Sequence, residues 1–161
     1  MKMLVLLIAI TTIITANPLG VGTEAPVFSL KDESGKTHTI KEHRGNRAVI
    51  LVFYPGNNTP VCTKQLCELR DSYADLSNYE SVQVYGINNG DAESHQKFKA
   101  KNRYPFPLLV DTKWQTAQKF GVSNGKGVTR HVFVIDSNGK IVFSQKGKPP
   151  VSDILKALKS K

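Results

Sequence analysis

The stretch RAVILVFYPGNNTPVCTKQLC, residues 47–67, contains both cysteines of the 161-residue chain. Its first part, residues 47–55, is a continuous apolar run rich in β-branched side chains, which predicts a strand buried on both faces. From residue 62 to about residue 79, apolar residues recur at spacings of three and four, which predicts one amphipathic helix. Cys62 is therefore expected at a strand-to-helix corner, in the first turn of the helix.

The rest of the chain alternates between strand and helix patterns. Strands are expected at 81–88, at 106–111 and on both sides of a turn at 137–139, helices at 91–102, 112–122 and 152–161, and an N-terminal hairpin at 25–40. Asp91 and Ser152 are the expected N-caps of two of these helices. This order predicts an α/β fold with a mixed central sheet, in a single domain over residues 17–161.

The first sixteen residues have the composition of a secretory signal peptide. Lys2 is a short positive region, residues 3–14 are almost continuously apolar, and Ala16 precedes a Pro-containing segment. We expect cleavage after Ala16, export to a periplasm, and no stable membrane insertion of the mature chain. A retained anchor is the alternative, although the apolar run is shorter than the ~20 residues of a spanning helix.

The chain is basic, with 22 Lys and Arg against 13 Asp and Glu and a formal net charge of +9. The lysines are scattered, with no run of five or more basic residues. No basic segment carries interleaved aromatic side chains. This pattern favours a solvated basic surface over a nucleic-acid partner.

The spacing of the two cysteines indicates a redox pair. Five residues of α-helix rise ~7.5 Å and turn the side chain by about 140°, whereas a disulfide needs Cα atoms within about 7 Å. Bridging Cys62 and Cys67 therefore requires the first helical turns to unwind. A structural disulfide closing so small a loop would also stabilise the fold little.

The expected corner favours a reactive thiol at Cys62. A free cysteine has a pKa near ~8.5, and a helix N-terminus stabilises its thiolate through unpaired N–H groups and the helix dipole. A nearby arginine would strengthen this effect, but it has to come from elsewhere in the chain.

The pattern Pro55-x-x-x-Thr59-x-x-Cys62 resembles the active-site signature of peroxiredoxins. The step of five residues to Cys67, followed by ELRD, is similar to the bacterioferritin comigratory protein or peroxiredoxin Q group. The segments APVFSLKDESGK, YPFPLLVD and RHVFVIDSNGKIV extend the similarity over nearly all of residues 17–161. The resemblance implies a thioredoxin-like fold with an N-terminal hairpin addition.

The resemblance also implies a role for each matching residue. Cys62 would be the peroxidatic cysteine and Cys67 the resolving cysteine, which forms an intramolecular disulfide. Thr59 would hydrogen-bond the hydroperoxide, Pro55 would cover the cysteine, and Arg130 would supply the positive charge. A thioredoxin-like protein would reduce the disulfide. No cofactor or metal is expected, and the chain is expected to be a monomer or a weak dimer.

Two other functions remain open at this point. An exported thiol–disulfide oxidoreductase normally uses Cys-x-x-Cys, which differs from the spacing here. A thioredoxin-like copper-binding protein would need both thiolates to converge with a histidine such as His131 or His95. We interpret His131 as a residue of the sheet, Gln65 as a residue that shapes local hydrogen bonds, and Trp114 as a core residue.

Overall fold

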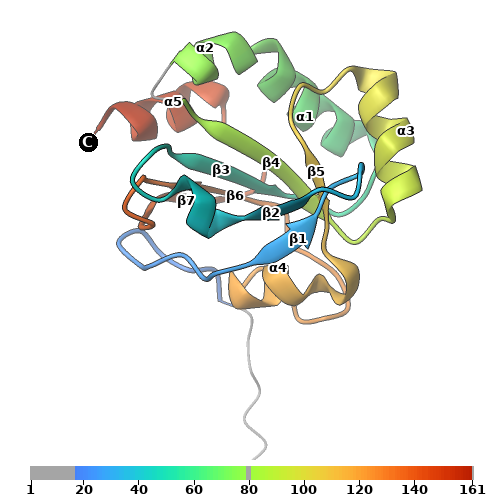
Figure 1. Cartoon of the computed structure of the whole chain (residues 1–161), viewed down its shortest axis with the longest axis horizontal. Helices are drawn as coiled ribbons and strands as arrows, with labels where there is room; N and C mark the ends of the chain where they lie inside the picture. The colour runs from blue at the N-terminus through green and yellow to red at the C-terminus, as the bar shows by residue number, and fades with distance from the viewer. Residues whose placement is uncertain (1–16, 79–80, 161) are drawn as a thin grey trace, which may run out of the picture.

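The computed structural model describes residues 17–78 and 81–160 (Figure 1). The predicted signal peptide, residues 1–16, lies outside the described residues. Within the described part of the chain, no helix combines the length and the apolar character needed to cross a membrane.

A five-stranded mixed sheet forms the centre of the domain, as the sequence predicts, with the strand order β5-β4-β3-β6-β7. β3, β4 and β5 run parallel, and β6 is antiparallel to both β3 and β7. The strands are β3 (Val49–Phe53), β4 (Gln83–Asn88), β5 (Leu108–Val110), β6 (His131–Ile135) and β7 (Ile141–Lys146). The predicted N-terminal hairpin is confirmed, since β1 (Ser29–Lys31) pairs antiparallel with β2 (Thr37–Thr39).

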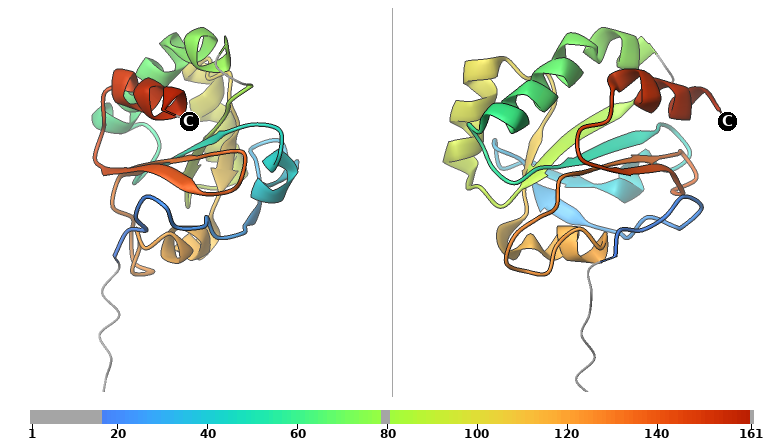
Figure 2. Two further views of the ribbon diagram at one scale, coloured as in Figure 1. Left: turned by 90° about the vertical axis from the view of Figure 1, so that its left-hand side faces the viewer. Right: turned by 180° about the vertical axis from the view of Figure 1, so that it is seen from behind.

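Helices cover both sides of the sheet (Figures 1 and 2). Helices α1, α2, α3 and α5 pack on one side, and α4 packs on the other side together with the hairpin. The helices are η1 (Ile40–His43), α1 (Pro60–Asp71), α2 (Tyr73–Asn78), α3 (Ala92–Asn102), η2 (Thr112–Trp114), α4 (Gln115–Lys119) and α5 (Val151–Lys159).

The central strand β3 divides the apolar interior into two cores. All five of its residues are buried, as the apolar run predicts. Ile50 and Val52 belong to the core under α1, whereas Leu51 and Phe53 belong to the core that contains α4. The alternation follows from the period of two in a strand, and it places the functional corner at one end of a rigid element.

The helix expected from residue 62 to 79 is two helices in the structure. It starts earlier, at Pro60, and breaks at Ser72, where the N–H donates to the carbonyls of Glu68 and Arg70. The carbonyl of Ser72 then accepts from Leu76, so that helical bonding resumes in α2. The predicted apolar spacing is nevertheless confirmed, because Leu66, Leu69 and Leu76 are buried.

Two further helix predictions need correction. The helix expected at 112–122 is interrupted, since Lys113 and Trp114 have left-handed backbone angles that bury the Trp114 ring in the core. The Asp111 carboxylate accepts from the N–H groups of Thr116 and Ala117 and so begins α4. Ser152 is not a cap, because α5 starts one residue earlier, after Pro150. By contrast, Asp91 caps α3 through the N–H of Ser94.

Candidate active site

The corner between β3 and α1 holds Cys62 where the sequence predicts it. Thr59 is the N-cap of α1, and its hydroxyl oxygen accepts from the N–H of Cys62 at 3.4 Å. Pro60 follows at the first helical position, where a missing N–H costs no hydrogen bond. Cys62 is the third residue of the helix and has an exposed fraction of 0%. The corner therefore surrounds a buried thiol with the positive end of a helix.

Arg130 adds a full positive charge beside the sulfur of Cys62 to the partial charge of the helix N-terminus. Its Nη2 donates to the Sγ of Cys62 at 3.0 Å, and its Nη1 donates to the Oε1 of Gln65 at 2.6 Å. The sheet explains this meeting, because Phe53 at the end of β3 pairs with His131 at the start of β6. Arg130 therefore lies beside the residues that leave β3. Such charge-assisted hydrogen bonds stabilise a negative sulfur.

Gln65 shapes the local hydrogen bonds, as interpreted from the sequence. Besides accepting from Arg130, it donates from Nε2 to the carbonyl of Gly147 at 3.5 Å. The N–H of Gly147 in turn donates to the carbonyl of Arg130 at 2.8 Å. Gln65 has an exposed fraction of 3%. The arginine is therefore held on its side chain and on its backbone.

The loop before α1 is fixed by Asn57, a residue that the sequence analysis does not single out. Its Oδ1 accepts from the hydroxyl of Tyr54 at 3.0 Å and from Nδ2 of Asn88 at 2.9 Å. Its Nδ2 lies 2.8 Å from the hydroxyl of Ser94 and 3.0 Å from Nδ1 of His95. Burial lowers the pKa of His95, which favours the neutral ring that accepts from Asn57. The signal for this cluster is that Asn57 and Asn88 follow or end two parallel neighbouring strands.

Cys67 lies in a different environment on the same helix. It is half-buried, and the hydroxyl of Tyr104 lies 3.9 Å from its Sγ. Burial raises the pKa of Tyr104 above its usual value, so the phenol is neutral near pH 7. Both cysteines are free thiols, and the intact helix keeps them apart. A disulfide between them requires α1 to unwind.

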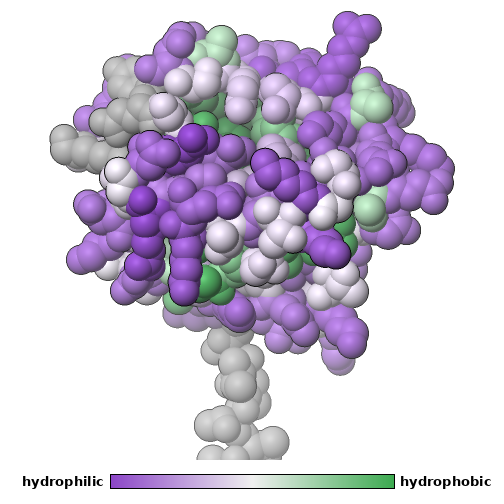
Figure 3. Space-filling model, viewed as in Figure 1, coloured by the Kyte–Doolittle hydropathy of each residue, from purple (hydrophilic) through white to green (hydrophobic). Residues whose placement is uncertain are grey.

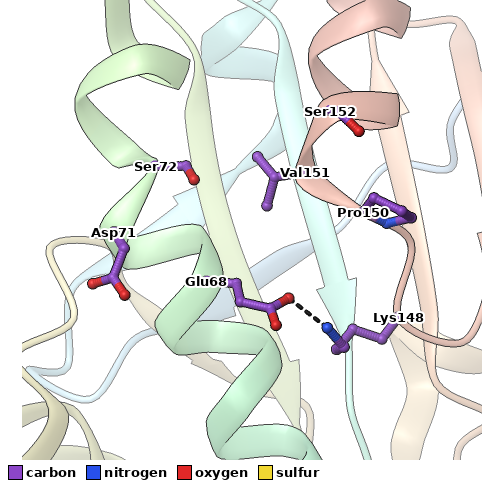
Figure 4. A pocket seen from close by; sticks show the side chains of 7 residues that line it. All are labelled: Glu68, Asp71, Ser72, Lys148, Pro150, Val151 and Ser152. Atoms are coloured by element: carbon purple, nitrogen blue, oxygen red, sulfur yellow. Dashed lines mark hydrogen bonds and ion pairs between the residues drawn. The ribbon is translucent and has the colours of Figure 1, made fainter.

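A groove of about 480 Å³ runs between the C-terminal half of α1 and the start of α5 (Figure 4). Glu68 and Lys148 form an ion pair of 2.5 Å across it. Since Glu68 is one turn beyond Gln65, two successive turns of α1 are tied to residues 147 and 148. These contacts oppose the unwinding of the helix.

Of the other residues named from the sequence, two are exposed at the corner, one lies in the sheet and one lies in the core. Pro55 is exposed at the beginning of the loop after β3, and Thr59 is exposed at the cap. The interpretation of His131 as a sheet residue is confirmed, since it begins β6 and its Nε2 lies 2.9 Å from the hydroxyl of Ser144. Trp114 is a core residue, as expected.

The structure gives no support to the two other functions. Helix α1 separates the thiols that a dithiol exchange site would hold together. Among the residues that the structure describes, no group of three or more His, Cys, Asp or Glu side chains is arranged to hold a metal ion.

A buried cysteine that accepts from an arginine at the N-terminus of a helix, in an α/β domain with a mixed sheet, defines a class of thiol-dependent oxidoreductases. The comparison with known families agrees. The AhpC/TSA family matches residues 21–144, and the chain belongs to this family.

The relatives are peroxiredoxins of the Q and Bcp group. Peroxiredoxin Q, chloroplastic, of Oryza sativa subsp. japonica is 36% identical over 146 residues, which are 86% of this chain and 66% of that protein. Peroxiredoxin Bcp of Bacillus subtilis (strain 168) is 34% identical over 150 residues, which are 86% of this chain and 94% of that protein. The chain thus spans just under two thirds of the rice protein and nearly all of the bacterial one.

Solved structures confirm the thioredoxin-like fold class. Peroxidoxin BcpB from Mycobacterium tuberculosis has a TM-score of 0.80 at 28% identity, over 87% of this chain and 96% of that chain. A PrxQ mutant of Xylella fastidiosa has a TM-score of 0.81 at 23% identity, over 89% of this chain and 98% of that chain, and shows the fold alone. The predicted resemblance is therefore confirmed, and the chain belongs to the peroxiredoxin family.

Proposed function

We propose that this chain reduces hydroperoxides with Cys62 as the peroxidatic cysteine. The thiolate of Cys62 attacks the terminal oxygen of ROOH, the O–O bond breaks, and one proton is taken up, giving a sulfenic acid and ROH. The observation that carries this proposal is the guanidinium of Arg130, which donates to Sγ at 3.0 Å and is itself held by Gln65. It stabilises the thiolate and the charge that develops on the leaving oxygen.

Thr59 and Pro55 would complete the substrate site. The hydroxyl oxygen of Thr59 accepts from the N–H of Cys62, which leaves its own O–H free to donate to a peroxide oxygen. Pro55 and Val61 are exposed beside this corner, and we assign to Pro55 the role of covering the sulfur. We propose hydrogen peroxide and organic hydroperoxides as the substrates of this site.

Cys67 would act as the resolving cysteine. Its thiol condenses with the sulfenic acid of Cys62, a disulfide forms, and one water leaves. The step requires the unwinding of α1, which breaks the contacts of Gln65 and Glu68 described above. A thioredoxin-like dithiol would then reduce the disulfide by exchange through a mixed disulfide. We propose that one chain completes this cycle, as a monomer or weak dimer.

The test is peroxide consumption by the reduced chain, with free thiols counted before and after one equivalent of hydrogen peroxide. The parent should lose two thiols, Cys62→Ser should lose fast consumption, and Cys67→Ser should react once and stop at the sulfenic acid. Cys67→Ser is the matched control, since it lies on the same helix and keeps Arg130. Fast consumption by Cys62→Ser, or two thiols left in the parent, would remove the proposal.

We also propose that residues 1–16 direct export and are removed. The support is the apolar composition of this segment and the docking of the chain directly after it, where the N–H of Leu19 donates to the carbonyl of Phe120. N-terminal sequencing of the chain after cell fractionation should give a start at Asn17 in the exported fraction. Full-length chain in the cytosol would contradict export.

A further inference from the structure

A second polar cavity lies on the side of the sheet opposite Cys62. Its volume is about 240 Å³, and it is lined by Lys36, His38, Glu42, His43, Arg47 and Tyr85. The hairpin and η1, which carry several of these residues, face the viewer in Figure 1, and this face is mostly hydrophilic in Figure 3. Tyr85 packs in the core opposite that of Cys62, so this cavity is separate from the active site.

One wall of the cavity is a buried hydrogen-bonded chain. The Asp32 carboxylate lies 2.7 Å from Nε2 of His38, so this nitrogen donates. Nδ1 of His38 lies 3.2 Å from the hydroxyl of Tyr85, which lies 2.8 Å from Nε2 of His43. All four side chains are buried. These groups satisfy one another and hold the wall in one geometry.

The side chain of Arg47, in contrast, has no hydrogen-bond acceptor among the described residues. It is half-buried, and its Nε is buried without a hydrogen-bond partner. Its guanidinium forms no ion pair within the described residues, whereas Arg44, three positions earlier, binds Glu24 at 2.6 Å. The ammonium of Lys36, on the rim, also forms no ion pair within residues 17–78 and 81–160. Buried donors are normally hydrogen-bonded, so an unpartnered guanidinium in a cavity is suited to binding an anion.

We propose that this cavity binds a small oxyanion, a phosphate or a carboxylate, with Arg47 as its main ligand and Lys36 and His43 as further donors. The volume is enough for such an anion and a few waters, at roughly 30 Å³ per water. Glu42 is the carboxylate that lines the cavity, 3.4 Å from Nε2 of His43, and its side chain is 42% exposed and can turn to solvent. Burial lowers the pKa of His43, the Glu42 carboxylate raises it, and the charge of Arg47 lowers it. An anion beside Arg47 would offset the repulsion between Arg47 and a protonated His43.

The proposal is tested by titrating inorganic phosphate into the reduced chain while the imidazole NMR signals of His38 and His43 are recorded. We expect a saturable shift of the His43 signals, and binding weakened roughly 10-fold or more in Arg47→Gln. Arg44→Gln is the matched control and should bind as the parent does. Acetate, titrated separately, distinguishes a carboxylate site from a phosphate site.

Peroxide consumption should be the same in all three proteins, because the cavity and Cys62 lie on opposite sides of the sheet. The proposal thus stands or falls independently of the peroxidase activity. No saturable response, or equal binding by Arg47→Gln, would overturn it, as would a response to Zn²⁺ alone and none to either anion. If Arg47→Gln does not fold, Arg47→Lys, which keeps the charge but loses the fork of donors, should weaken binding by a smaller factor.

Discussion

Cys62 and Cys67 lie five positions apart on one helix and have opposite surroundings. Cys62 is fully buried, and Arg130 donates to its sulfur at 3.0 Å. Cys67 is half-buried, and within the described residues its polar neighbour is the neutral hydroxyl of Tyr104 at 3.9 Å. The same residue type on the same element therefore has two different environments. The tertiary contact with Arg130, rather than the position on the helix alone, makes the environment of Cys62 different from that of Cys67.

The contacts along α1 repeat this difference. Cys62, Gln65 and Glu68 contact charged or strongly polar groups of residues 130, 147 and 148. On the Cys67 side, Arg70 donates to the carbonyl of Asn102 at 2.7 Å, and Cys67 itself packs against the apolar core. The sulfur of Cys62 is thus held by a charge-assisted contact, whereas the sulfur of Cys67 has a weak polar one. Unwinding α1 breaks contacts on both sides of the helix.

The largest effect on this comparison is expected from Arg130→Met, which removes the charged donor to the sulfur of Cys62. The rate constant of the first step with hydrogen peroxide should fall roughly 100- to 1,000-fold, because a preorganised donor to the reacting charge is lost. Stopped-flow kinetics measures this step directly. Arg44→Met, a surface arginine paired with Glu24, is the control. A rate within a few-fold of the parent would mean that Arg130 is structural.

Acid should destabilise the fold through His131, which directly follows Arg130 but stacks on Phe133 in the core opposite Cys62. Burial, with repulsion from Lys146, lowers the pKa of His131 to about 4, against ~6.5 in an unfolded chain. Between these values the unfolded chain binds a proton that the folded chain does not, so stability is lost as the pH falls through this window and is complete above it.

The measurement is urea unfolding at about pH 7.5 and about pH 5. The loss of unfolding free energy between them should be smaller in His131→Thr by about 2 kcal/mol. His43 and His95, whose pKa values are also lowered by burial, titrate in both proteins and leave this difference unchanged. An equal loss in the two proteins would contradict the effect of His131.

The strand-to-helix corner could be predicted because local patterns determine it. The apolar run of β3, the cap at Thr59 and the helical spacing after Cys62 are all short-range, and the structure has each of them. The breaks at Ser72 and at Lys113 could not be predicted. They depend on where the apolar faces meet the core, and Trp114 adopts a left-handed backbone to bury its ring.

The residues of the site can be identified from the sequence, but the contacts between them depend on the tertiary structure. Arg130 was identified by resemblance, but its bond to Gln65 depends on the register of β3 with β6. For Asn57 the sequence offers only its place after a buried strand, since its four partners come from β3, β4 and α3 and the loops beside them. A polar side chain whose partners are distant in sequence leaves no local signal.

A smaller effect is expected from Gln65→Ala, which frees Arg130 without removing its charge. The rate constant of the first step should fall roughly 10-fold, since a hydrogen bond to a charged group contributes ~1.5–3 kcal/mol and part of it is recovered by Gly147 and water. Gln65→Glu should keep the rate near that of the parent, because a carboxylate also accepts from the guanidinium. Equal losses in both variants would show that Gln65 acts only by packing.

The smallest effect is expected from Tyr104→Phe, which removes the hydroxyl that lies 3.9 Å from the sulfur of Cys67 and leaves the stacking on Phe106 intact. Without this contact Cys67 should leave its position more readily, so that disulfide formation accelerates roughly two- to fivefold, which corresponds to ~0.5–1 kcal/mol. The first step should change little, because no hydrogen bond joins Tyr104 to Cys62 among the described residues. Rapid mixing with peroxide, followed by thiol trapping at successive times, separates the two steps. Tyr73→Phe is the control, since Tyr73 also lies against Phe106 but makes no contact with sulfur. If Tyr104→Phe slowed the first step as much as it changed the second, the two cysteines would not be held independently, and the difference between their environments would not separate their roles.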